Sequence, residues 1–176
     1  MILGILSDTH GFVPNRLLEL FEGVDGILHA GDIGNDMVLH ALNAVAPTVA
    51  VRGNVDEFGI ADAIVHITRG NKRITIVHNA GDIIHPARDL YTRVLTEPTD
   101  ILISGHYHGW WVEHIQMPDG HPVLWLSPGA AGNSGHHHIR TAMRLTIRDQ
   151  ALQDGTFEDY TLEKIDLGPR EMYAGW

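Results

Sequence analysis

The chain has 176 residues, with 12 basic and 22 acidic side chains, for a formal net charge of −10. Its length suits one domain of ordinary size with a substantial core, so we expect residues 1–176 to form a single domain. The acidic balance argues against binding of long nucleic acid, because neutralising its phosphates requires lysine and arginine. The absence of cysteine excludes disulfide scaffolds, thiolate metal sites and cysteine nucleophiles.

The first half of the chain alternates short apolar runs with segments of helical spacing. We expect strands at residues 2–6, 26–30 and 47–51, and helices at residues 15–21 and 36–45. This order is typical of βαβ units and predicts a parallel sheet. The opening strand meets a charge at Asp8 without a basic leader, and no later segment approaches the ~20 apolar residues of a membrane helix. We therefore expect a cytoplasmic protein without a membrane partner.

The second half is richer in strands. Residues 63–68 and 73–77 flank a hairpin loop, and a helix is expected at 87–95. Further strands are expected at 100–103, 110–116, 122–126, 141–147 and 156–162, with turns at residues 118–120 and 153–155. A mixed first half and a β-rich second half predict an α/β fold in which two mixed β-sheets pack face to face, with helices outside.

Polar side chains gather where these strands end. Because ligands of α/β sheets bind outside the carboxyl ends of the strands, we expect these side chains to share one rim. Carboxylate, imidazole and amide groups are ligands that suit a pair of divalent metal ions. We expect the Asp-x-His and His-x-His pairs to be extended, since alternate residues then point the same way. The side chains, in chain order, are Asp8, His10, Asp32, Asn54, His78, His106 and His108.

The motifs around these residues resemble the calcineurin-like metallophosphoesterases, and in particular their small bacterial and archaeal phosphodiesterases. The resemblance extends over most of the chain and implies a four-layer αββα sandwich, the fold of a eukaryotic retromer subunit. It also implies two divalent metal ions, with manganese favoured over iron, zinc, nickel or magnesium. The motifs are Ser7-Asp8-Thr9-His10-Gly11, Ala30-Gly31-Asp32, Gly53-Asn54-Val55-Asp56, the lone His78 and Gly105-His106-Tyr107-His108.

The same resemblance implies a role for each residue, with Asp32 shared between the two ions. Two such ions acidify a water between them, which would attack the phosphorus of a small phosphodiester or nucleotide in line. Catalysis through the metals would depend on Asp32, Asn54, His78 and His106. One ion would take Asp8, His10, Asp32 and His108, and the other would take Asp32, Asn54, His78 and His106.

Neighbouring residues offer support and substrate contacts. Asn54 and Arg52 are candidates to bind substrate, although an ordinary salt bridge would explain Arg52 equally well. His29 and Asp56 are expected to orient the loops or the ligands around the metals. Val55 stands where the family has a histidine beside the leaving group, so the general acid is unassigned. His85 and the histidine triplet at residues 136–138 are candidates for that role by composition alone, and the triplet is otherwise expected to be a solvated loop.

Three interpretations of function stay open. The first is a phosphodiesterase. The second is a non-catalytic, metal-binding scaffold for another protein, which is disfavoured because such relatives lose part of the metal set and this chain keeps His10. The third is a phosphomonoesterase or pyrophosphate-cleaving hydrolase, which Val55 disfavours because poor leaving groups need a proton donor. Related small phosphodiesterases often self-associate, so a homo-oligomer is a further expectation that no pattern in the chain tests.

Overall fold

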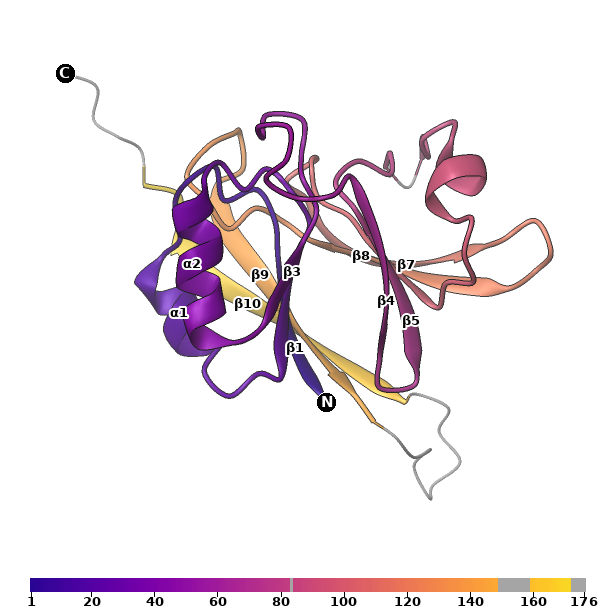
Figure 1. Ribbon diagram of the computed structural model, residues 1–176, viewed down its shortest axis with the longest axis horizontal. Helices are drawn as coiled ribbons and strands as arrows, with labels where there is room; N and C mark the ends of the chain where they lie inside the picture. The colour runs from indigo at the N-terminus through magenta and orange to yellow at the C-terminus, as the bar shows by residue number, and fades with distance from the viewer. Residues whose placement is uncertain (83, 149–158, 172–176) are drawn as a thin grey trace.

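The middle of the molecule consists of two five-stranded sheets that face each other (Figure 1). The computed structural model describes residues 1–82, 84–148 and 159–171. In the first sheet, three parallel strands carry an antiparallel neighbour on one side. The strands are β1 (Ile2–Leu6), β2 (Gly26–His29), β3 (Thr48–Ala50), β9 (Ile139–Ile147) and β10 (Tyr160–Pro169), in the order β10-β9-β1-β2-β3.

The second sheet has three parallel strands in its middle and an antiparallel strand at each edge. The strands are β4 (Ile64–Arg69), β5 (Lys72–Val77), β6 (Ile101–Ile103), β7 (Trp110–Gln116) and β8 (Pro122–Pro128), in the order β4-β5-β6-β8-β7. The predicted hairpin is confirmed, because β4 and β5 pair antiparallel across a loop of Gly70 and Asn71. The carboxyl ends of β5 and β6 lie at the same edge, which is the requirement for bringing their loops together.

Helices cover the outer faces. Figure 1 shows α1 (Asn15–Leu20) and α2 (Asp36–Val45) side by side on the outside of the first sheet. The outside of the second sheet is covered by a single π-helical turn, η1 (Leu90–Val94). The expectation of two mixed sheets with helices outside is therefore confirmed, with a thin fourth layer. Among the described residues, no helix has the length and apolar character needed to cross a membrane.

Three hydrophobic clusters hold the layers together. Leu3 and Ile5 of β1 point between the sheets and pack in one cluster with Ile76 and Ile103 of the second sheet. Leu6 of the same strand points the other way, into a cluster formed with both helices. A third cluster joins the π-helical turn to the outer face of the second sheet. Strands buried on both faces explain the continuous apolar runs of the sequence.

Two sequence expectations differ from the structure. The helix expected at 87–95 is wrong, since only Leu90–Val94 forms a turn, and the amide of Leu95 bonds the carbonyl of Leu90 at 2.8 Å. This wider turn lets Leu90, Val94 and Leu95 all face the sheet, which explains the apolar spacing. The strand expected at 156–162 begins outside the described residues and continues as β10 to Pro169. The turn expected at 153–155 also lies outside the described residues.

Candidate metal centre

The loops that follow strands of both sheets are bound to one another by their backbones. The amide of Asp8 donates to the carbonyl of Gly31 at 2.9 Å, which joins the loops after β1 and β2. The amide of Gly105 donates to the carbonyl of His78 at 2.9 Å, which joins the loops after β5 and β6. The two sheets meet where the amide of His106 donates to the Asp8 carboxylate at 3.1 Å. One rim therefore holds all the loops that carry the predicted ligands.

Asp8, His10 and His108 form one group of possible ligand atoms at this rim. The Asp8 carboxylate is fully buried, and its Oδ1 lies 3.2 Å from Nε2 of His108. Oδ1 of Asp8 and Nε2 of His10 are both buried without a hydrogen-bond partner in the described part of the chain. Buried polar atoms are nearly always paired, so unpaired ones call for an ion, a water or a ligand. A divalent cation between them fits this donor set.

The second group surrounds Asn54. Its side-chain oxygen lies 3.0 Å from Nε2 of His78 and 3.0 Å from Nδ1 of His106. His78 Nε2 also lies 3.3 Å from Oδ1 of Asp32. Ligand atoms ~2.1 Å from a common ion are separated by about 3.0 Å in an octahedron and about 3.4 Å in a tetrahedron. The observed spacings fall in this range.

Asp32 lies between the two groups. Its Oδ1 faces His78 at 3.3 Å, whereas its Oδ2 lies 3.7 Å from Nε2 of His10. The amide of Val55 donates to Oδ1 at 3.2 Å and holds the carboxylate in this orientation. Glycine at position 53 leaves room for the Asp32 carboxylate, because a Cβ there would lie 1.9 Å from Oδ1 of Asp32. One carboxylate can therefore offer an oxygen to each group.

Five of the seven candidate ligands have left-handed backbone, whereas the sequence predicts extended chain for the Asp-x-His and His-x-His pairs. Among the described residues, five non-glycine residues have positive φ, and all five are candidate ligands. Such backbone costs a residue with a side chain roughly 1–3 kcal/mol, and it gathers at functional sites. The expectation that alternate residues converge because the chain is extended is therefore wrong; tight turns bring them together. The residues are Asp8 (φ 56°), His10 (φ 48°), Asp32 (φ 52°), His106 (φ 73°) and His108 (φ 56°).

Charge and burial set the protonation of the centre. Burial would raise the pKa of Asp32, but the hydrogen bond and charge of His78 outweigh it and lower the pKa to about 2. Burial opposes the charged form of His78, yet Asp32 and Asp8 raise the pKa of that ring above its usual value. Burial and the charge of His78 lower the pKa of His106. His78 donates from Nδ1 to the Ala30 carbonyl at 2.8 Å, which leaves Nε2 to face the centre.

Residues 1–150 match the calcineurin-like phosphoesterase superfamily domain. The chain belongs to this superfamily. It is 30% identical to a probable metallophosphoesterase of Methanocaldococcus jannaschii over 158 residues, which are 85% of this chain and 78% of that protein. The superfamily binds divalent metals, in agreement with the ligand groups described above.

Solved structures agree in fold with this calcineurin-like phosphoesterase. A structure of an archaeal phosphodiesterase superposes with a TM-score of 0.68 at 25% identity, covering 95% of this chain and 100% of the other. The Vps29 protein of Entamoeba histolytica, solved in complex with zinc, superposes with a TM-score of 0.67 at 23% identity, covering 94% and 99%. The fold is therefore shared with an archaeal phosphodiesterase and with Vps29.

His29 and Asp56 hold the loops of the rim in place and belong to neither ligand group. His29 is fully buried, and burial lowers its pKa to about 4. Its Nδ1 accepts from the Gly31 amide at 3.1 Å, so its Nε2 donates to the hydroxyl of Thr9 at 2.9 Å. That hydroxyl donates in turn to the Ile33 carbonyl at 2.9 Å. Thr9 was not singled out in the sequence; its place between Asp8 and His10 was the available signal.

Among the described residues, Asp56 binds backbone amides and no histidine. Its carboxylate accepts from Ile33 at 3.0 Å, Gly34 at 2.7 Å and Gly53 at 2.7 Å. The bonds from Ile33 and Gly34 join the loop after β2 to the loop after β3, and the bond from Gly53 closes a turn within the second loop. Of the two roles considered for Asp56, the geometry supports holding the loops.

Arg52 and Val55 lie on the outer side of the centre. Arg52 lines a shallow cleft of about 150 Å³ together with Asn54, His78 and Asn79. Its guanidinium stacks over the ring of Phe58, 4.9 Å from the centroid. Val55 is 58% exposed, so its side chain points to solvent beside Asn54. An anion approaching the centre would meet the Arg52 charge but no proton donor at position 55.

The remaining candidates for the general acid, His85 and the histidine triplet at residues 136–138, differ in their exposure and contacts. His85 is exposed and lies 3.5 Å from Asp82, and within the described part of the chain it makes no hydrogen bond or ion pair with the centre. His136 and His138 are exposed, as predicted for a solvated loop, but the prediction is wrong for His137. Its half-buried ring packs on His108 with centroids 5.1 Å apart.

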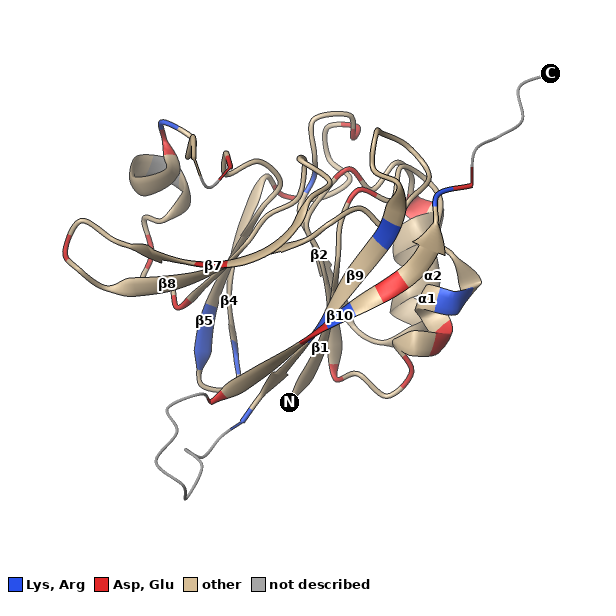
Figure 2. Ribbon diagram, turned by 180° about the vertical axis from the view of Figure 1, so that it is seen from behind, with Lys and Arg blue, Asp and Glu red and all other residues tan. Residues whose placement is uncertain are grey.

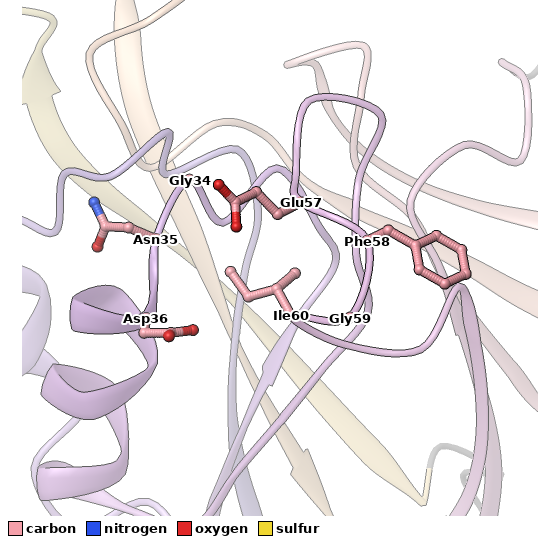
Figure 3. Close-up of a pocket in the computed structure, with 7 residues that line it drawn as sticks. All are labelled: Gly34, Asn35, Asp36, Glu57, Phe58, Gly59 and Ile60. Atoms are coloured by element: carbon pink, nitrogen blue, oxygen red, sulfur yellow. The ribbon is translucent and has the colours of Figure 1, made fainter.

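A separate hollow of about 390 Å³ lies between the start of α2 and the loop after β3 (Figure 3). Figure 3 shows the carboxylates of Asp36 and Glu57 at this hollow near Ile60, while the ring of Phe58 points away from them. Figure 2 shows acidic residues on several of the loops at the same end of the sheets. The hollow contains no candidate ligand, and its negative charge disfavours a phosphoester.

Proposed function

We propose that this protein is a dinuclear metal-dependent phosphodiesterase that hydrolyses small phosphodiesters or nucleotides. The observation that carries the proposal is the pair of ligand groups that share Asp32. One oxygen of that carboxylate faces His78 and the other faces His10. Membership of the superfamily supports metal-assisted hydrolysis of phosphoesters, and the identity to a probable metallophosphoesterase agrees with it.

The proposed ligand sets follow the two groups. Oxygen and nitrogen donors without sulfur suit manganese, with iron, zinc, nickel and magnesium as alternatives. Two ions held there would activate a shared water and neutralise charge on the phosphoryl oxygens. One set is Asp8, His10, Asp32 and His108, and the other is Asp32, Asn54, His78 and His106.

The residues of the chain perform several tasks around that chemistry. The low pKa of Asp32 keeps its carboxylate charged at neutral pH, so it can hold cations, and the buried carboxylate of Asp8 adds oxygen donors to the first group. Asn54 contributes a neutral oxygen, which limits repulsion of an anionic substrate. Arg52 offers positive charge at the neighbouring cleft. Val55 gives no proton to a leaving group, which favours diesters with acidic leaving groups over monoesters.

The test compares hydrolysis of bis(p-nitrophenyl) phosphate and p-nitrophenyl phosphate by the metal-free full chain after addition of manganese. We expect about two manganese ions per chain and faster cleavage of the diester. Asp32→Asn should abolish both metal binding and hydrolysis, because the variant removes the charge facing both groups. Asp62→Asn is the matched control, since Asp62 is exposed and only its backbone contacts Arg52.

Each alternative predicts a different result. A strong preference for the monoester would replace the phosphodiesterase with a phosphomonoesterase. Metal binding without hydrolysis of any phosphoester would favour a scaffold, a role for which the fold shared with Vps29 leaves room. Unchanged hydrolysis by Asp32→Asn would contradict the proposed centre itself.

A further inference from the structure

The histidine triplet follows β8 and reaches back to the candidate metal centre through one member. Nδ1 of His137 lies 3.2 Å from Nδ1 of His108, and the two rings meet at an interplanar angle of 78°. His136 and His138 are exposed on either side of it. The chain therefore offers three adjacent histidines of which one contacts a candidate ligand.

The hydrogen bonds of His137 have only one consistent direction for a neutral ring. Its Nε2 lies 3.0 Å from the carbonyl of Gly132, and a carbonyl can only accept, so Nε2 carries the proton. Nδ1 of His137 is then an acceptor, and the proton between the rings belongs to Nδ1 of His108. This leaves the lone pair of His108 on Nε2, the atom that lies 3.2 Å from Asp8.

The loop is built around this contact. A Cβ on Gly135 would lie 2.2 Å from Nδ1 of His108, so only glycine leaves room for the ring of His108 beside that of His137. Arg170 donates to the carbonyls of Gly135 and Asn133 and holds the loop in place. The amide of Gly132 donates to the carbonyl of Asp8 at 3.1 Å. Asp8, His108, His137 and Gly132 thus form a closed cycle of contacts.

We propose that His137 is a positioning residue that fixes the tautomer and orientation of His108 for metal binding. The inference rests on the proposed metal centre and goes beyond it, because His137 belongs to neither ligand set and contacts His108 through its Nδ1. Partners that orient a ligand histidine change metal affinity by about 10–100-fold when removed. His137 therefore raises the affinity of the group formed by Asp8, His10 and His108.

The test is calorimetric titration of the metal-free full chain with manganese chloride. His137→Leu should weaken one of the two binding events about 10–100-fold and leave the other unchanged. His136→Leu and His138→Leu are matched controls that remove the exposed neighbours and should retain both events. His137→Gln should restore most of the affinity, because its amide can donate to Gly132 and accept from His108. Calorimetry also separates this loss from weak manganese binding by the triplet as a whole.

The outcomes separate the inference from the proposed function. Binding by the wild type that His137→Leu leaves unchanged, or an equal loss in His136→Leu, would overturn the role of His137 alone. No binding by the wild type would overturn the metal centre and His137 with it. A second measurement needs no variant: nitrogen NMR of the metal-free wild type should find His108 protonated on Nδ1. Protonation of His108 on Nε2 instead would overturn the inference even if His137→Leu failed to fold.

Discussion

The left-handed backbone of the candidate ligands should be measurable as stored strain. His106 has a φ of 73°, in the left-handed region. His78, which lies next to it in the proposed centre, does not have a positive φ and serves as the comparison. Left-handed backbone costs a residue with a Cβ roughly 1–2 kcal/mol, a penalty that glycine escapes. In ordinary backbone, glycine is instead less stable than alanine by about 0.5–1 kcal/mol, because it loses more entropy on folding.

The perturbation is therefore a pair of substitutions at each position. His106→Gly should be more stable than His106→Ala by roughly 0.5–1 kcal/mol, the strain relieved minus the entropy of glycine. At His78 the order should reverse, with His78→Gly less stable than His78→Ala by about 0.5–1 kcal/mol. The hydrogen bond from the amide of residue 106 to Asp8 is common to both variants and cancels in the comparison.

The assay is urea unfolding of the four variants in the presence of a chelator, so that metal binding does not contribute. Midpoints should shift without a change of slope, which would show that the surface exposed on unfolding is the same. The reasoning would be refuted if glycine were less stable than alanine at both positions. It would then follow that the turn after β6 carries no strain that glycine relieves.

Three further predictions concern the same rim. Val55→His should raise hydrolysis of phenyl phosphate, a monoester with a poor leaving group, by on the order of 10²-fold, and an unchanged rate would separate position 55 from the leaving group. Gly53→Ala should abolish manganese binding in calorimetry by displacing Asp32. Gly59→Ala also places a Cβ on backbone of positive φ (109°), but its Cβ meets nothing within 4 Å, so this variant should retain binding; equal binding by the two variants would contradict the close approach of Gly53 to Asp32. In metal-free protein, urea unfolding should show that the wild type is more stable than Asp32→Asn, with the full difference in free energy of unfolding above pH 3.8. This difference should shrink toward pH 2, because the pKa of Asp32 in the folded protein lies below its usual 3.8. A difference that grew on acidification would contradict that pKa.

Most of the fold could be predicted because the apolar pattern depends on local periodicity. Strands buried on both faces and helices buried on one leave different patterns in sequence, and the predicted order of strands and helices matched the structure in the first half. The segment at 87–95 was misjudged because Leu90, Val94 and Leu95 fit a helical face, while the wide turn that buries them depends on the sheet beneath. Packing against the sheet determines this conformation, and no local sequence pattern predicts it.

The candidate site was predictable in composition but not in conformation. Motif order identified the residues that meet at the rim, since strand ends of parallel sheets share an edge. The left-handed turns at Asp8 and His108 could not be predicted, because their cost is met by contacts from loops distant in sequence. His137 was missed for a similar reason: its burial depends on the space left by Gly135, and a run of three histidines looks uniform in sequence.

The relation between folding and metal binding in the proposed centre follows from the distances in sequence between its residues. The hydrogen bond between His106 and Asp8 joins residues 98 positions apart and links loops of different sheets. Contacts of such long range require most of the chain to be in place, so the donor cluster is completed late in folding. The hydrophobic cluster between the sheets joins Leu3 to Met143, which lie even farther apart in sequence, so the core and the donor cluster depend on the same late contacts. The ions of the proposed centre would therefore bind to a sandwich that has already folded.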